Sequence, residues 1–159
     1  MLKFYNVDTT YTDYLRKYEN KVPFITYSNN NKFVCGVVLL INDYHYFAPI
    51  SSNIRKQKTN IIIKNKKGEK TSSIKFSFMF PIPLNLIKEM NFNVIRKYNP
   101  KHTDLLQNEL KFCRKNESLI TNKALKIYNL VKYKNAYIKN FCCDYSLLEK
   151  KYDEWIKNH

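Results

Sequence analysis

Short apolar segments separated by polar turns fill the first half of the chain, a pattern that predicts β-strands. The apolar segment Lys32–Ile41 and the aromatic segment Tyr44–Ile50 stand on either side of Asn42 and Asp43. Asparagine and aspartate favour tight turns, so the two segments predict a β-hairpin. Further strands are predicted at Leu2–Val7, Asn60–Lys64, Ser73–Phe80 and Asn93–Lys97.

The second half instead places apolar residues three and four positions apart, which predicts amphipathic helices. One helix is expected from Thr103, its N-cap, to about Asn116, with Leu106, Leu110 and Cys113 on its apolar face. A second helix is expected over Asn122–Tyr133.

Two other stretches carry signals for the start of a helix. Ser146 and Glu149 have the spacing of a capping box, in which serine and glutamate bond each other's main-chain N–H groups, and they predict a C-terminal helix. Thr12 is a suitable N-cap for a short helix at Tyr14–Glu19. Strands followed by helices, without a linker or repeat, predict a single α+β domain over residues 1–159. We expect a twisted antiparallel sheet, barrel-like in outline, with flanking helices.

The charge of the chain points to a polyanionic partner. There are 28 lysines and arginines against 13 acidic residues, which gives the 159 residues a formal net charge of +15. A codon bias toward lysine and asparagine would raise the lysine count without lowering the number of acidic residues. The chain also has 13 tyrosines and 10 phenylalanines, which can stack on bases. Nucleic acid is therefore the first candidate partner, and an anionic membrane surface is the second.

Several classes of site find no support in the sequence. The four cysteines, Cys35, Cys113, Cys142 and Cys143, lack the C-x-x-C spacing of zinc sites and are expected to be reduced and buried. The acidic residues are scattered, so no metal is expected, and two isolated glycines cannot form a phosphate-binding loop. No apolar run suits a membrane span or a signal peptide. We therefore expect a cytoplasmic protein with no membrane partner and no cofactor.

One reaction fits the residues that remain. RNA carries its own nucleophile, the 2′-hydroxyl, so a protein can cleave it by alignment, proton transfer and charge stabilisation without a metal. Lys32 opens one strand of the predicted hairpin and two serines close the other, and those two ends are adjacent in an antiparallel pair. The residues suited to this chemistry are Tyr27, Lys32, Ser51, Ser52, Arg55 and Lys56.

Each of these residues also has an ordinary structural interpretation. Paired serines after a proline often bond their own backbone in a turn, and a lysine at the start of a strand is usually solvated. His102, at the start of a predicted helix, is likewise expected to be solvated. These alternatives stay open on the residues alone.

Six short motifs follow one another along nearly the whole chain. They read K-F-Y at Lys3–Tyr5, K-V-P at Lys21–Pro23, Y-F-A-P-I-S-S at Tyr46–Ser52, K-F-S-F-M-F-P-I-P at Lys75–Pro83, L-Q-N-E-L-K-F at Leu106–Phe112 and C-D-Y-S-L-L-E-K-K-Y at Cys143–Tyr152. In this order and spacing, the chain resembles the ToxN/AbiQ family of endoribonuclease toxins from type III toxin–antitoxin systems.

The resemblance implies a distorted β-barrel with flanking helices, related to the MazF and Kid toxins. It implies a metal-independent, sequence-specific endoribonuclease that leaves a 2′,3′-cyclic phosphate and a 5′-hydroxyl. The implied partners are a small RNA antitoxin, a repeated pseudoknot that the toxin cuts from a precursor, and cellular and phage RNA substrates. Toxin and RNA would alternate in a closed hetero-oligomer assembled through RNA, and phage infection would release the toxin.

The resemblance also implies roles for single residues. The family's loop tyrosine falls on Tyr27 and its strand-opening lysine on Lys32, in register with Gly36. Its Thr-Ser pair falls on Ser51 and Ser52, where serine keeps the hydroxyl. Our hypothesis is that Ser52 helps to hold the scissile phosphate, that Lys32 moves a proton or stabilises charge, and that Tyr27 orients the RNA.

One position departs from the family pattern. Relatives often carry a lysine two places after the serine, where this chain has Ile54. We expect Arg55 or Lys56 to take the part of that lysine.

The helical half is expected to supply much of the RNA-binding surface, with tyrosines stacking on unpaired bases. The predicted RNA contacts are Lys58, Lys111, Arg114, Lys115, Lys123, Lys126, Lys132, Tyr133, Lys134 and Tyr137. Two rival interpretations remain. The altered loop is compatible with an RNA-binding module that lacks catalysis, and the basic charge with a membrane-surface protein. Against the second, no predicted helix concentrates Trp and Phe on one face.

Overall fold

The predicted β-hairpin is the centre of the molecule. The structure, a computed structural model, describes residues 1–27, 35–134 and 136–159. Strands β2 (Gly36–Ile41) and β3 (Tyr44–Ser51) pair in antiparallel register from Gly36↔Pro49 to Ile41↔Tyr44. The turn residues Asn42 and Asp43 both have positive φ, 52° and 63°, which a two-residue hairpin turn requires and these residue types tolerate.

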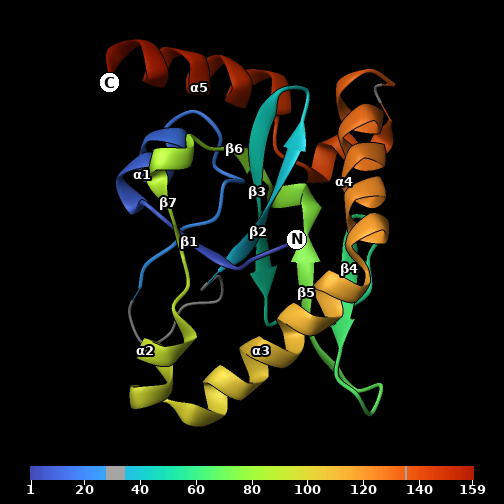
Figure 1. The fold of residues 1–159 in the computed structure, drawn as a ribbon. Coiled ribbons are helices and arrows are strands. Elements are labelled where there is room, and N and C mark those ends of the chain that lie inside the picture. Colours follow the sequence, from blue (N-terminus) through green and yellow to red (C-terminus); the bar gives the residue numbers. More distant parts are fainter. Residues whose placement is uncertain (28–34, 135) are drawn as a thin grey trace.

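The hairpin belongs to a seven-stranded antiparallel sheet (Figure 1). The strand order is β4-β5-β3-β2-β1-β7, and β6 pairs with β3 beside this path. Within the described residues, β4 and β7 are the two edges and do not pair with each other, so the sheet is not closed. The other strands are β1 (Tyr5–Val7), β4 (Asn60–Lys64), β5 (Lys70–Lys75), β6 (Phe80–Pro81) and β7 (Ile87–Glu89).

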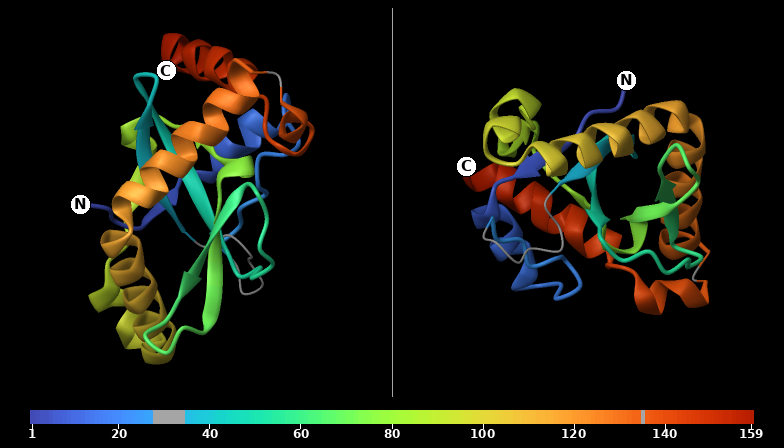
Figure 2. Two further views of the ribbon diagram at one scale, coloured as in Figure 1. Left: turned by 90° about the vertical axis from the view of Figure 1, so that its right-hand side faces the viewer. Right: turned by 90° about the horizontal axis from the view of Figure 1, so that it is seen from below.

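Helices lie around this sheet, which confirms the predicted α+β class. In Figures 1 and 2, α4 lies along one side of the sheet, α3 below it and α5 across the top. No helix in the described part of the chain has the length and apolar character of a membrane span. The α-helices are α1 (Thr9–Arg16), α2 (Phe92–Tyr98), α3 (Pro100–Lys115), α4 (Glu117–Lys132) and α5 (Tyr145–Asn158), and the short 3-10 helices are η1 (Phe76–Phe78), η2 (Leu84–Leu86) and η3 (Tyr137–Phe141).

Two predicted elements in the chain were wrong in kind or in position. The predicted strand Asn93–Lys97 is helix α2, because the Asn91 side chain accepts hydrogen bonds from two main-chain N–H groups and caps a helix there. The first helix begins at Thr9 rather than Tyr14, and Asp8 caps it. Thr12 lies buried inside that helix.

Other boundaries also moved. Helix α3 begins at Pro100, and its N-cap is Asn99 rather than the predicted Thr103. The predicted strand Ser73–Phe80 ends at Lys75, and Phe76–Phe78 forms a 3-10 turn although Phe76 stays in the core. The capping box at Ser146 does not form, because the Asp144 side chain accepts from Leu147 N (3.1 Å) and starts α5 two residues earlier.

A buried polar network joins the sheet to the last helix. Glu149 on α5 is 6% exposed and accepts hydrogen bonds from the hydroxyls of Tyr46 on β3 (2.7 Å) and Tyr128 on α4 (2.6 Å). Lys132 on α4 forms an ion pair with the other carboxylate oxygen. Burial raises the pKa of Tyr46, so its hydroxyl stays protonated and donates. Three elements far apart in sequence are thus held at one carboxylate.

Candidate active site

The basic loop, which we define as residues 51–58, leaves the end of β3 and is fixed by its own side chains. Ser51 Oγ accepts from Asn53 N (3.1 Å), and Asn53 Oδ1 accepts from Arg55 N (2.9 Å). Ser51 therefore makes the turn bond that was the ordinary interpretation of the serine pair. Its buried side chain shapes the loop.

Side chains of β4 and β5 also hold the main chain of this loop. Asn60 Nδ2 donates to Arg55 O (2.9 Å), and Asn60 Oδ1 accepts from Gln57 N (3.0 Å). Ser73 Oγ donates to Asn53 O (2.6 Å). The main chain of the loop is thus fixed, and the side chains of Arg55 and Lys56 are exposed to solvent. A fixed loop with exposed cations is suited to hold an anion at a defined position.

Ser52 lies at the edge of a small cleft between β3, β5 and α3. Its side chain is exposed and has no hydrogen-bond partner among the described residues, in contrast to Ser51. The cleft has a volume of about 160 Å³. It is lined by Cys35, Ile50, Ser51, Ser52, Thr71, Ser72, His102, Leu105, Leu106 and Glu109.

Glu109 is the one carboxylate that lines this cleft, and the sequence analysis missed it. It is 4% exposed, and its Oε2 accepts from Thr71 Oγ1 (3.0 Å) and from Ser72 Oγ. Burial raises its pKa, whereas the two hydroxyl bonds and the charge of His102 act in the opposite direction. A signal was present in the sequence, because helical spacing puts Glu109 on the same buried face as Leu106 and Cys113.

His102, which we expected to be solvated at the start of a helix, also lines the cleft. It is half-buried and lines the cleft together with Ser52 and Glu109. Its main-chain N–H donates to Asn99 Oδ1 (3.1 Å), which caps α3 and fixes the first helical turn.

Replacing Glu109 with glutamine should change the pH dependence of stability. Since the folded-state pKa of Glu109 is raised above the ordinary 4.5, the unfolded chain loses this proton first as the pH rises. The free energy of unfolding of the wild type should therefore fall relative to Glu109→Gln as the pH rises from about 4 toward neutral. Urea unfolding of both proteins across this range measures the difference, and a difference independent of pH would contradict it.

Tyr27 lies near the same end of the sheet but with its hydroxyl already bonded. The hydroxyl donates to Val7 O (3.1 Å) and accepts from Val7 N (2.7 Å). Tyr5 pairs with Gly36 and Gly36 with Pro49, so β1, which ends at Val7, and β3, which ends at Ser51, lie on either side of β2. Two strand spacings of about 4.8 Å separate them. The Tyr27 side chain is 50% exposed, so its ring is available even though its hydroxyl is not.

Lys32 lies outside the described residues, so its predicted role stays a prediction. Description of the chain resumes at Cys35, whose carbonyl accepts from Ile50 N (2.9 Å), next to Ser51.

Two of the predicted cations of α4, Lys123 and Lys126, lie close to Lys56 of the basic loop. Burial lowers the pKa of Lys123, and the positive charges of Lys126 and of Lys56 in the loop lower it further. Like charges this close favour an anion between them. Loop and helix α4 therefore form one cationic surface beside the cleft.

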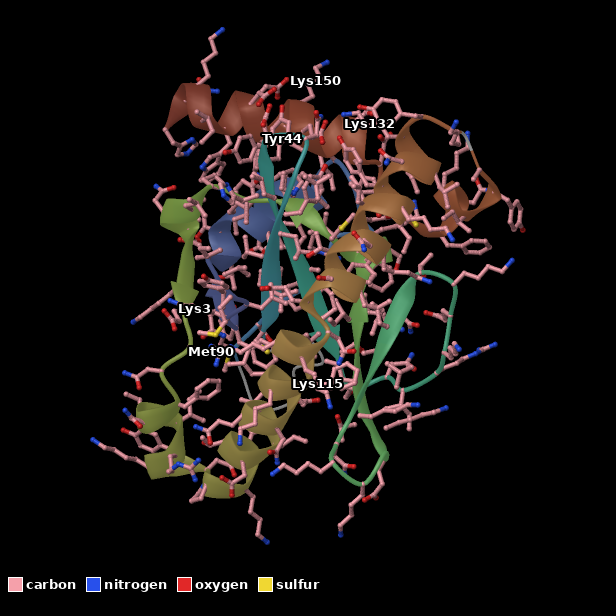
Figure 3. The ribbon with its side chains drawn as sticks, turned by 45° about the vertical axis from the view of Figure 1, so that its right-hand side comes forward. Lys3, Tyr44, Met90, Lys115, Lys132 and Lys150 are labelled. Atoms are coloured by element: carbon pink, nitrogen blue, oxygen red, sulfur yellow. The ribbon has the colours of Figure 1, made fainter. Side chains whose placement is uncertain are left out.

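The other predicted RNA contacts are divided among different places. Lys111 and Arg114 line a separate hollow with Lys3 and Glu89, and Arg114 Nε donates to Leu2 O (2.8 Å). Lys132 is held by Glu149, so we remove it from the proposed RNA surface. Figure 3 shows Lys115 near the bend between α3 and α4 and Lys132 near α5, far along α4.

The remaining predicted contacts are accessible. Tyr133 and Tyr137 are 62% and 75% exposed, and Lys58, Lys115, Lys126 and Lys134 are also exposed.

Thiol and metal chemistry have little basis in the described residues. All four cysteines are free and buried, as predicted, and burial raises the pKa of Cys113 to about 12 and that of Cys142 to about 11. In the described ranges, no three His, Cys, Asp or Glu side chains gather where they could hold a metal ion.

Known proteins are similar to this chain in sequence and in fold. A family model described as "Toxin ToxN, type III toxin-antitoxin system" matches residues 3–153. Endoribonuclease ToxN of Bacillus thuringiensis subsp. kurstaki is 28% identical over 162 residues, which cover 96% of this chain and 84% of that protein.

Two solved structures extend the comparison to three dimensions. One concerns selective toxin inhibition by a non-coding RNA pseudoknot in bacterial type III toxin–antitoxin systems, and it matches with a TM-score of 0.88 at 27% identity over 97% of both chains. The other is AbiQ, a lactococcal anti-phage endoribonuclease of a type III toxin–antitoxin system, with a TM-score of 0.83 at 26% identity over 99% of both chains. Since the family match spans nearly the whole chain, as the motifs predicted, this protein belongs to the ToxN family of type III toxin–antitoxin toxins.

Proposed function

We propose that this protein is the endoribonuclease of a type III toxin–antitoxin system and that its active centre is the basic loop with the cleft below it. Its relatives are endoribonucleases by name, and the fold agrees with theirs. The observation that supports this site most directly is the exposed Ser52 hydroxyl. It stands without a described partner on a loop of fixed main chain that also carries Arg55 and Lys56.

The reaction needs no group beyond RNA and protein side chains. The 2′-oxygen attacks phosphorus and forms a 2′,3′-cyclic phosphate while the bond from phosphorus to the 5′-oxygen breaks. A base takes the 2′-proton and an acid gives a proton to the leaving 5′-oxygen, so atoms and charge balance without a metal. Lys32 is our proposal for one of these proton transfers or for charge stabilisation.

The loop supplies the electrostatic part of this mechanism. Ser52 donates a hydrogen bond to a non-bridging phosphate oxygen, and Arg55 or Lys56 opposes the charge that develops there. Tyr27 positions RNA with its ring only, since its hydroxyl is bonded to Val7 and burial raises its pKa.

The cationic surface beside the cleft is suited to the antitoxin. We propose that a small RNA pseudoknot, cut by the toxin from a repeated precursor, occupies this surface and inhibits the enzyme. Toxin and RNA then assemble into a closed complex in the cytoplasm, where the toxin acts on cellular and phage RNA as an abortive-infection defence. The anti-phage activity of AbiQ and the pseudoknot inhibition of a structural relative support this proposal.

Cleavage of total bacterial RNA by the purified protein in excess EDTA tests the activity and its chemistry. We expect cutting that EDTA does not reduce, with products that carry 2′,3′-cyclic phosphates and 5′-hydroxyls. Cleavage that is lost in EDTA and restored by Mg²⁺ would overturn the metal-free mechanism. RNA binding without any cleavage would favour the inactive RNA-binding module, which the Ile54 departure keeps open.

A further inference from the structure

The basic loop borders a second, larger cavity, and the proposed cleavage reaction uses none of the residues that line it. Gln57 lies five residues after Ser52 in the chain. It lines, together with Lys58, a cavity of about 610 Å³. This volume lies within the range of small-molecule sites. The cavity is lined by Lys21, Gln57, Lys58, Thr59, Ser77, Phe78, Tyr137, Ile138, Asn140 and Phe141.

Aromatic side chains form one wall of this cavity. Tyr137 and Phe141 on η3 are 75% and 57% exposed, and their rings lie 5.5 Å apart at 71°. The Phe78 side chain contributes from η1. Exposed aromatic rings beside lysines are typical of surfaces on which unpaired nucleobases stack.

A buried lysine fixes the orientation of the Gln57 side-chain amide at the edge of this cavity. Lys75 is 3% exposed, and its Nζ donates to Gln57 Oε1 (3.0 Å). Within the described residues no carboxylate pairs with Lys75, and burial lowers its pKa. Since an ammonium group only donates, the oxygen of the Gln57 amide must face Lys75 and its NH₂ group must face away.

The cavity therefore offers several hydrogen-bond donors. The NH₂ group of Gln57 and the ammonium groups of Lys58 and Lys21 donate, although Lys21 also pairs with Glu19 (3.7 Å), whereas Thr59, Ser77 and Asn140 can donate or accept. At C4 of the pyrimidines and C6 of the purines, uracil and guanine carry a carbonyl oxygen that accepts from such donors. Cytosine and adenine carry an amino group at the same position, which would meet these donors with a further donor.

We propose that this cavity binds one unpaired nucleobase with a carbonyl edge, uracil or guanine, of an RNA that lies across the basic loop. Gln57 is the specificity-determining residue, Lys75 is a positioning residue that holds the Gln57 amide in one orientation, and Tyr137 and Phe141 stack on the base. The proposal rests on the proposed function, since the same loop holds the scissile phosphate.

Binding experiments with non-cleavable RNA separate this proposal from catalysis. The probes are five-residue 2′-O-methyl oligonucleotides with abasic flanks and a single central uracil, guanine, cytosine or adenine, titrated by calorimetry at low salt. We expect the wild type to bind the uracil or guanine probe about tenfold more tightly than the adenine and cytosine probes. Tyr137→Ala should weaken binding of all four probes, whereas Tyr98→Ala, which removes another highly exposed aromatic ring on α2, should not.

Substitution of Gln57 by glutamate reverses the proposed hydrogen-bond pattern. The glutamate keeps the bond from Lys75 and presents an oxygen to the cavity, so the preference should shift toward adenine and cytosine. Asn108→Asp adds the same charge at an exposed position on α3 and should leave the preference unchanged. Lys75→Met frees the Gln57 amide to turn and should reduce the discrimination without loss of affinity for every probe.

Sequencing of cut sites in a random RNA pool keeps the two proposals distinguishable. Wild-type cuts should show uracil or guanine at one fixed distance from the scissile bond, and Gln57→Glu should change that position alone. If Gln57→Glu cuts with the wild-type pattern and binds the four probes as the wild type does, the base pocket is wrong and the nuclease stands. If the wild type discriminates among the probes but cuts no RNA, the pocket stands and the proposed nuclease function fails.

Discussion

Replacing Ser52 with alanine should lower the rate of RNA cleavage by about 10²–10³-fold, the usual loss when a donor to a developing negative charge is removed. RNA affinity should stay nearly unchanged, since the cations of the loop and of α4 remain. The fold should also be preserved, because the Ser52 side chain is exposed and supports no described contact. Single-turnover cleavage of a labelled RNA, beside a filter-binding assay, measures both quantities.

Two further variants make the Ser52 result specific. Ser52→Thr keeps a hydroxyl and should retain most of the activity. Ser118→Ala removes an exposed serine hydroxyl on α4 and should have no effect. Wild-type cleavage by Ser52→Ala would show that this hydroxyl does not contact the reacting phosphate, and the proposed centre would have to be abandoned.

Replacing Glu149 with alanine should lower the free energy of unfolding by about 3–5 kcal/mol. The substitution removes the shared acceptor of Tyr46 and Tyr128 and the ionic partner of Lys132, and it leaves all three side chains buried or half-buried without that partner. The loss is large because buried donors cannot turn to water for replacement bonds. Urea unfolding followed by circular dichroism at neutral pH measures it.

A second acidic residue on α5 provides the control. Glu154 pairs with Lys151 at the surface of the same helix, so Glu154→Ala should leave the free energy of unfolding nearly unchanged. A loss below about 1 kcal/mol in Glu149→Ala would mean that the three donors find other partners.

The sequence predicted those parts of the fold that depend on local chemistry. Asn42 and Asp43 tolerate positive φ, and the apolar runs beside them are unambiguous, so the hairpin was predicted correctly. Helix α2 was missed because Val94 and Ile95 favour a strand, whereas a single Asn91 side chain starts a helix. The predicted starts of other helices were wrong by a few residues, because several polar residues near each start can serve as the N-cap.

The candidate site was predictable only in part. The hydroxyls and cations of the loop stood together in sequence, and the resemblance to a nuclease family supplied the reaction. The residues that surround the loop were not predictable, because Glu109 and His102 come from α3 and reach the cleft only through packing. The burial of Lys75 was not predictable for the same reason. Its side chain lies on the other face of β5 from Ile74, and at this end of the strand both faces are buried.

The contacts of α5 also bear on the order in which the fold is completed during synthesis. The ribosome makes α5 after all the other described elements. Until then Tyr46 and Tyr128 lack their acceptor Glu149, and Phe76, beside the end of β5, lacks its bond from the Tyr145 hydroxyl (2.8 Å). We therefore expect the sheet of a nascent chain that still lacks α5 to be less firmly packed than the sheet of the finished protein.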